Sequence, residues 1–148
     1  MEPLHRTDPP LLTITRILPA SPQTVFDAWT TAESVRHWMC PESTSIPLAE
    51  LDVRVGGAFR VDMLVEGERL VHTGVYREIR PPEKLVFTWT SKNTQHRNTL
   101  VTVELRALGD KTELKLTQTL LPDDAATQQH ARGWAQIVEH LAGYLQTR

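Results

Sequence analysis

The stretch Pro122–Gln146, PDDAATQQHARGWAQIVEHLAGYLQ, decides the fold because it predicts the one long helix of the chain. Its first residues, Pro122, Asp123 and Asp124, suit the positive end of a helix. Apolar residues then recur at helical spacing and predict a single buried stripe, made of Trp134, Ile137, Val138, Leu141 and Leu145. A helix over this stretch would be about 35 Å long.

Upstream of this helix the hydrophobic period changes to two, which predicts β-strands. Short turns rich in Gly, Pro and acidic residues separate the strands, so consecutive strands are expected to pair antiparallel. A polar loop is expected over Ser91–Arg97. The predicted strands are Leu48–Val53, Phe59–Val65, Leu70–Ile79, Leu85–Trp89, Thr99–Leu105 and Leu114–Leu120.

The N-terminal part adds one strand and two short helices. Residues 1–10 are expected to form a loose tail, and residues 11–148 a single domain. Leu11–Leu18 alternates as a half-buried strand. Ser21-Pro22 begins a helix, and a second helix begins at Thr30 or Thr31 and ends before Pro41. Pro41–Pro47 is expected to be a loop. The whole is an α+β domain in which a curved antiparallel sheet of about six or seven strands wraps around the C-terminal helix.

This order of elements predicts space between sheet and helix. One helix, about 10 Å wide, is too narrow to cover the concave face of such a sheet. Large side chains fill the remaining space, or a pocket is left there. The small residues Gly74, Ala131 and Gly133 favour some room. The residues expected to line the space are Trp38, Met39, Phe59, Val61, Met63, Phe87, Trp89, Gln118, His130, Trp134, Ile137 and Leu141.

Composition excludes several classes of protein. The chain has 148 residues, of which 40% are hydrophobic and 23% charged, with a formal net charge of −2. No basic stripe for nucleic acid and no apolar segment of about 20 residues for a membrane span is visible. Cys40 is the single cysteine, so no internal disulfide is possible. No secretory signal is visible either, and a cytoplasmic protein is expected.

Residues that could carry chemistry are few. The six histidines form no metal-binding pair, so neither a metal nor another cofactor is expected. Cys40 lies near His37, but the negative end of a helix disfavours a thiolate, and a packing role is expected. No catalytic residue is assigned. His130 shares a side of the last helix with Trp134, where it either meets a ligand or bonds a neighbouring segment. Gln118, if it points inward, must meet a ligand, a water molecule or another side chain.

Several blocks of the sequence resemble one family. VYREIRPPEKLVFTW (Val75–Trp89) is similar to the strand–Pro-Pro–strand signature of the activator-of-Hsp90-ATPase homologue-like family, of the START-like (SRPBCC, Bet v 1-like) superfamily. DVRVGG, TLVTVEL, TELKLTQ, HARGW and VFDAWTTAESVRHW resemble further blocks, and the likeness spans about residues 11–146. It implies the helix-grip fold, often with an internal pocket. Superfamily members bind lipids, sterols, polyketides and hormones, and a few are cyclases or aromatases.

The leading interpretation is therefore a non-enzymatic protein that binds a small, largely apolar molecule. One alternative is an enzyme of the cyclase, dehydratase or hydrolase kind, with His130, Gln118 and Glu78 supplying the polar groups. Another is an interaction module, either a homodimer or the partner of a chaperone. Chaperone-activating relatives carry an additional N-terminal domain, whereas about ten residues precede the first strand here, so a chaperone partner is not expected.

Overall fold

A computed structural model describes residues 11–40 and 45–146 of the chain. Seven strands, three α-helices and one 3₁₀ turn follow one another in these residues. Their order is β1 (Leu11–Leu18), α1 (Pro22–Thr30), α2 (Ala32–Trp38), β2 (Ser45–Leu51), β3 (Ala58–Val65), β4 (Glu68–Arg80), β5 (Lys84–Trp89), η1 (Lys92–Thr94), β6 (Thr99–Leu108), β7 (Lys111–Thr119) and α3 (Asp124–Gln146).

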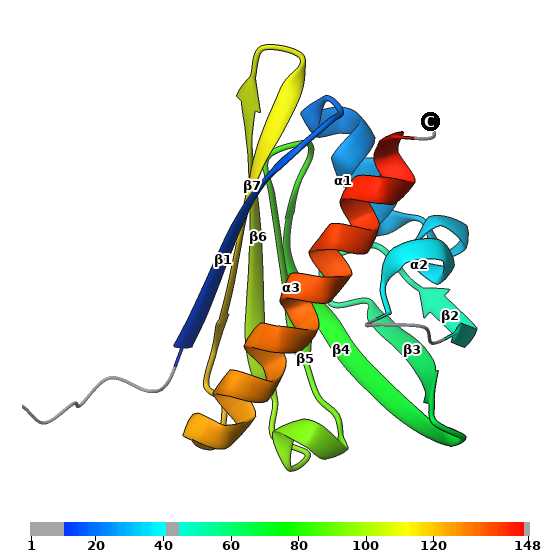
Figure 1. Cartoon of the computed structure of the whole chain (residues 1–148). Helices are drawn as coiled ribbons and strands as arrows, with labels where there is room; N and C mark the ends of the chain where they lie inside the picture. Colours follow the sequence, from blue (N-terminus) through cyan, green and yellow to red (C-terminus); the bar gives the residue numbers. More distant parts are fainter. Residues whose placement is uncertain (1–10, 41–44, 147–148) are drawn as a thin grey trace, which may run out of the picture.

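The strands form one antiparallel sheet in the order β1-β7-β6-β5-β4-β3-β2. Every step from β2 to β7 joins neighbours in the sheet, as short turns dictate. Only β1 is displaced, and it pairs with the last strand, β7. The sheet curves around α3, and α1 and α2 lie beside the C-terminal half of that helix (Figure 1). The predicted helix-grip fold, with two short helices after the first strand, is confirmed.

Apolar and polar residues alternate along the strands, and this alternation places them on opposite faces of the sheet. On β3, Phe59, Val61 and Met63 are buried on the concave side, whereas Arg60 and Leu64 are exposed on the convex side. The cross-strand register pairs Val61 with His72 and Met63 with Leu70, so these β4 residues also face inward.

Several predicted boundaries are wrong. The strand expected over Leu48–Val53 ends at Leu51, β6 continues to Leu108, and β7 begins at Lys111. The loop expected over Pro41–Pro47 ends earlier, because Ser45–Pro47 belongs to β2 and Ile46 is buried. Residues 41–44 of that loop lie outside the described part of the chain. The last strand ends at Thr119, since Leu120 takes a positive φ of 70°. That turn leaves Leu120 half exposed and sends Leu121 into the core instead.

Helix α3 begins where the acidic residues predict. The carboxylate of Asp123 accepts a hydrogen bond of 2.8 Å from the backbone N–H of Ala126, which caps the helix. The predicted apolar stripe is buried along its whole length. On the other side of the helix, Glu139 binds the guanidinium of Arg16 through both carboxylate oxygens, at 2.7 and 3.1 Å, and so ties α3 to β1.

All four tryptophans lie in one chain of ring contacts at the centre of the core. Trp38 meets Trp29 edge-on with ring centroids 4.7 Å apart, and Trp29 stacks on Trp134 at 6.2 Å. Trp134 in turn lies 5.0 Å from Trp89. Aromatic contacts of this kind add to the burial free energy of the rings. Within the described residues, no helix is both long and apolar enough to cross a membrane.

Candidate ligand-binding site

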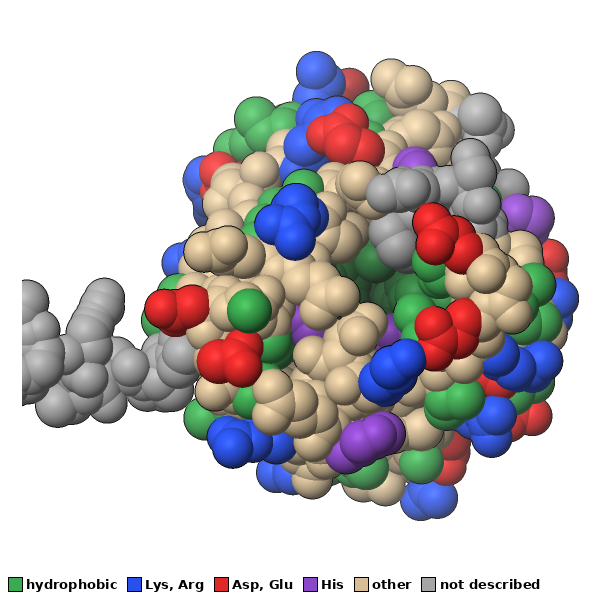
Figure 2. Space-filling view, turned by 60° about the horizontal axis from the view of Figure 1, so that its bottom comes forward, with side chains coloured by type: hydrophobic (Ala, Val, Ile, Leu, Met, Phe, Trp, Pro, Cys, Tyr) green, Lys and Arg blue, Asp and Glu red, His purple; other side chains and the backbone are tan. Residues whose placement is uncertain are grey.

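An open cleft of about 350 Å³ lies between the first half of α3 and the β3–β4 hairpin. Figure 2 looks toward this end of the molecule and shows a hollow with hydrophobic side chains in its depth. Apolar and aromatic side chains form most of its wall, and polar ones stand at its rim. The residues around it are Met63, Val65, Leu70, His72, Trp89, Asn93, Gln129, His130, Arg132, Gly133, Trp134, Gln136 and Ile137.

Gly133 is the place where α3 leaves room. A Cβ added at Gly133 would meet no atom within 4 Å, so the missing side chain is open space at the cleft. The expectation for Gly74 was wrong. A Cβ there would lie 2.4 Å from the ring of Phe59 and 2.0 Å from the carbonyl oxygen of Thr88. Gly74 therefore lets Phe59 pack closely and leaves no space.

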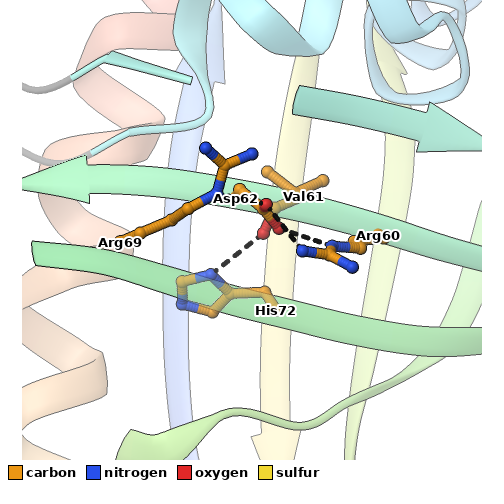
Figure 3. Close-up of polar contacts among 5 residues, drawn as sticks. All are labelled: Arg60, Val61, Asp62, Arg69 and His72. Carbon is orange, nitrogen blue, oxygen red and sulfur yellow. Dashed lines mark hydrogen bonds and ion pairs between the residues drawn. The ribbon is translucent and has the colours of Figure 1, made fainter. Parts of the chain in front are cut away.

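Two histidines border the cleft, one on each of its walls. His72 comes from β4 and is only 5% exposed, and its ring lies 4.8 Å from that of Trp89. Its Nδ1 is 3.3 Å from the carbonyl oxygen of Val61 on β3 (Figure 3). His130 comes from α3, and its Nδ1 is 2.8 Å from the carbonyl oxygen of Ala126, one turn earlier.

Burial keeps both imidazoles neutral. Desolvation lowers the pKa of His72 to about 4; the bond to Val61 opposes this shift, and the nearby His130 adds to it. Desolvation also lowers the pKa of His130, against the opposing effect of the bond to Ala126. At neutral pH the cleft therefore carries no charge on either ring.

A buried polar network holds the two tryptophans that wall the cleft. The Nε1–H of Trp134 donates to Oε1 of Gln118 at 2.8 Å, and Nε2 of Gln118 donates to the hydroxyl of Thr99 at 2.9 Å. That hydroxyl donates to the carbonyl oxygen of Trp89 at 2.6 Å. Gln118 thus meets other side chains, which is one of the alternatives the sequence left open. Because each of these groups has its partner, the network fixes the indole of Trp134 and the backbone of Trp89.

A second, much smaller space lies deeper in the core and shares Trp89 with the cleft as a wall. It holds about 20 Å³, roughly the volume of one water molecule. Trp29 lines it, and its Nε1 is, among the described residues, the one buried side-chain N or O atom without a hydrogen-bond partner. Tyr76 also lines this inner space, and burial raises the pKa of its hydroxyl.

The structure divides the predicted lining residues into three groups. Those at the open cleft are Met63, Trp89, His130, Trp134 and Ile137. Those at the inner space are Met39, Phe59, Val61 and Phe87, again with Trp89. Three others border neither space and are fully enclosed in the core, namely Trp38, Gln118 and Leu141. Trp38 uses its Nε1–H within the protein, as a donor to the carbonyl oxygen of Ala28 at 3.1 Å.

His72 is one of several cleft residues that the sequence reasoning missed; the others are Val65, Leu70, Asn93, Gln129, Arg132 and Gln136. A usable signal was present, because His72 is in phase with Leu70, Gly74 and Tyr76 along the strand. The phase was hard to follow, since an irregularity in the β4–β5 pairing lies between Tyr76 and Glu78.

Other polar residues considered from the sequence lie away from the cleft. Glu78 pairs with Arg80 at 2.6 Å and, across the strands, with Lys84 at 3.7 Å, and it does not border the cleft. The imidazole of His37 contacts Glu33 at 3.1 Å, and Cys40 is buried. No group of three or more His, Cys, Asp or Glu residues suited to a metal ion is found in residues 11–40 and 45–146.

One ion cluster backs the cleft from the convex side of the sheet (Figure 3). The carboxylate of Asp62 binds Arg60 at 2.8 and 2.9 Å and Arg69 at 2.8 Å. The arginines themselves cover Asp62 from solvent, and their hydrogen bonds lower the pKa of its carboxyl. Asp62 directly follows Val61, whose carbonyl oxygen accepts from His72. Two adjacent residues of β3 therefore connect the ion cluster on the convex face with the cleft on the concave face.

The fold and the site together define a class: a helix-grip domain with an open cleft beside the first half of its long helix. The chain belongs to the family described as activator of Hsp90 ATPase homolog 1-like protein, whose model matches residues 19–146. Among curated proteins, no match to the sequence is found.

Solved structures of bacterial proteins share this fold. A protein of Chromobacterium violaceum is 26% identical with a TM-score of 0.84, and the match covers 93% of this chain and 99% of that one. A protein of Silicibacter pomeroyi is 24% identical with a TM-score of 0.80, at the same coverage. One of Nitrosomonas europaea is 22% identical with a TM-score of 0.79, covering 93% and 94%.

Proposed function

We propose that the protein binds a small, largely apolar molecule in the cleft between α3 and the β3–β4 hairpin. The observation that carries this proposal is the cleft itself, whose volume of about 350 Å³ suits a small molecule. Its wall is mainly apolar and aromatic, with a few polar groups that would fix the orientation of a ligand.

Affinity would come from apolar surface that the ligand and the cleft remove from water together, at roughly 25 cal/mol per Å² before the costs of association. The indole of Trp134 is already held by its hydrogen bond to Gln118, and the buried ring of Trp89 packs 5.0 Å from it. A ligand would therefore meet two packed aromatic surfaces, and this favours affinity.

Binding is favoured over catalysis by the kind of polar group at the cleft. Its lining among the described residues includes no carboxylate and no thiol. The two imidazoles hold their protons toward backbone carbonyl oxygens of Val61 and Ala126, rather than toward a partner that would activate a nucleophile. The enzyme alternative has no support of comparable weight.

Gly133 provides a direct test. A Gly133→Leu variant would add an isobutyl group at the cleft, where its Cβ meets no atom within 4 Å. The matched control is Gly143→Leu on the same helix, where an added Cβ also meets no atom within 4 Å and which does not line the cleft. Both variants replace a helical glycine, so both should fold at least as well as the wild type.

The measurement is native mass spectrometry of the three proteins purified from the natural host. We expect a small molecule to accompany the wild type and the Gly143→Leu control, and to be absent from Gly133→Leu. The proposal fails if all three carry the same molecule, because the cleft would then not be its site. It also fails if the wild type carries none and takes up no apolar probe in a calorimetric screen.

A further inference from the structure

The two histidines give the cleft a definite hydrogen-bonding character. A backbone carbonyl oxygen only accepts, so the Nδ1 of His130 must carry the proton that it shares with Ala126 at 2.8 Å. A neutral ring has one N–H, and Nε2 of His130 therefore holds a bare lone pair. His130 is half-buried and borders the cleft, so a ligand there can reach this ring.

The same reasoning applies to His72 on the opposite wall. Its Nδ1 lies 3.3 Å from the carbonyl oxygen of Val61, and the backbone of Leu70 supplies a further acceptor to the ring. With the one proton of the neutral ring on Nδ1, Nε2 is the acceptor. The ring is almost fully buried and touches Trp89, so water has little access to it. The indole N–H of Trp134, a donor that could have balanced these acceptors, is already used by Gln118.

We propose that the ligand of this cleft is a neutral, largely apolar molecule that carries a hydroxyl or N–H group and donates it to Nε2 of His72 or His130. The inference rests on the proposed function and names its substrate class. A carboxylate in the same place would face two lone pairs, and a methyl ether would leave both without a donor. Either mismatch would cover an imidazole nitrogen with the ligand and leave it without a donor, which is costly. Among the donors at the cleft, Gln129 and Arg132 are exposed at its rim, Asn93 and Gln136 are half-buried like His130, and the indole N–H of Trp89 belongs to the wall.

The tautomers are the first point to test, in the unliganded protein. Long-range ¹H–¹⁵N spectra distinguish the two neutral forms of each imidazole by the shift of its bare nitrogen. We expect the Nδ1–H form for both His72 and His130 near pH 7.5. The Nε2–H form at both rings would overturn the inference, whatever the cleft binds.

The second test compares three probes that share one apolar body: 2-naphthol, 2-methoxynaphthalene and 2-naphthoate. Calorimetry gives their affinities for the wild type at a pH where 2-naphthol is neutral. One good hydrogen bond in place of an unpaired acceptor corresponds to roughly a tenfold difference, so we expect 2-naphthol to bind about ten times more tightly than the other two.

Two variants assign that preference to the rings. His72→Phe keeps an aromatic ring against Trp89, and His130→Leu keeps an apolar side chain on α3; each removes one acceptor. We expect the preference for 2-naphthol over its methyl ether to shrink in at least one of them. His37→Gln, which removes an exposed histidine that does not border the cleft, is the matched control and should keep the preference.

The outcomes separate this inference from the proposed function. Equal binding of all three probes, blocked by Gly133→Leu, would overturn the donor requirement and leave apolar binding in place. Tightest binding of 2-naphthoate, lost in Arg132→Gln, would also overturn it, since the rim would then decide. If no probe binds and Gly133→Leu changes nothing, both ideas fall.

Discussion

Acid should destabilise this protein through one buried ring, that of His72. Its pKa is 6.5 in the unfolded chain and about 4 in the folded protein. At pH values between these two pKa values, His72 is protonated in the unfolded state but neutral in the folded state. The free energy of unfolding therefore falls as the pH falls. Stability is full above pH 6.5 and decreases toward pH 4.

The size of this loss of stability follows from the pH range between the two pKa values. Each pH unit inside it is worth about 1.4 kcal/mol, so His72 should remove about 2 kcal/mol between about pH 8 and pH 5. The charged groups that act on the ring are His130, which lowers the pKa further, and Asp62 on the other face of β3, which raises it. Both effects are smaller than that of burial.

Urea unfolding at the two pH values, for the wild type and for His72→Phe, measures this effect. The variant keeps a ring against Trp89 but has nothing to protonate, so its acid loss should be smaller than that of the wild type by about 2 kcal/mol. A His37→Gln control, which removes an exposed histidine, should retain the acid loss because His72 is still present. If His72→Phe loses as much stability in acid as the wild type, the ring is not held neutral by burial and the reasoning is refuted.

Three further substitutions test the packing. Gln118→Leu leaves the indole N–H of Trp134 without an acceptor and should lower the free energy of unfolding by about 1–3 kcal/mol in urea titrations; an unchanged midpoint would mean that the network contributes nothing. Gly74→Ala forces a methyl group against Phe59 and should cost about 1–3 kcal/mol or more, visible as a lower Tm, whereas a Tm equal to that of the wild type would contradict the close approach. Gly143→Ala, in open space on α3, should raise stability by about 0.5–1 kcal/mol in the same urea experiment, and a loss there would show that the helix is not free at this point.

The sequence was sufficient for the architecture because the relevant signals are local. Alternation of apolar residues on β3 gave the face of each side chain, and the acidic start of α3 gave the beginning of the helix. Leu120 shows the limit of such reasoning. It continues the alternation of β7, yet a single residue with positive φ reverses its direction, and nothing in the apolar pattern marks that turn.

The candidate site was only partly predictable because it depends on which inward residues are left uncovered. Trp134 and Leu141 belong to the same stripe of α3, and only the first borders the cleft. The difference arises from α2 and β1, which pack against the helix, whereas its N-terminal half borders the cleft. Periodicity identifies the apolar stripe of a helix, but it does not show how much of that stripe other elements cover.

The chain of ring contacts that joins the four tryptophans has an optical consequence. Indoles whose centroids lie 4.7 to 6.2 Å apart exchange excitation energy readily, so Trp38, Trp29, Trp134 and Trp89 should emit as one coupled chromophore. Two of its members form a wall of the cleft. A quencher placed there would dim the emission of all four rings, including Trp38, which no ligand in the cleft would touch. The protein thus contains its own fluorescent reporter of occupancy.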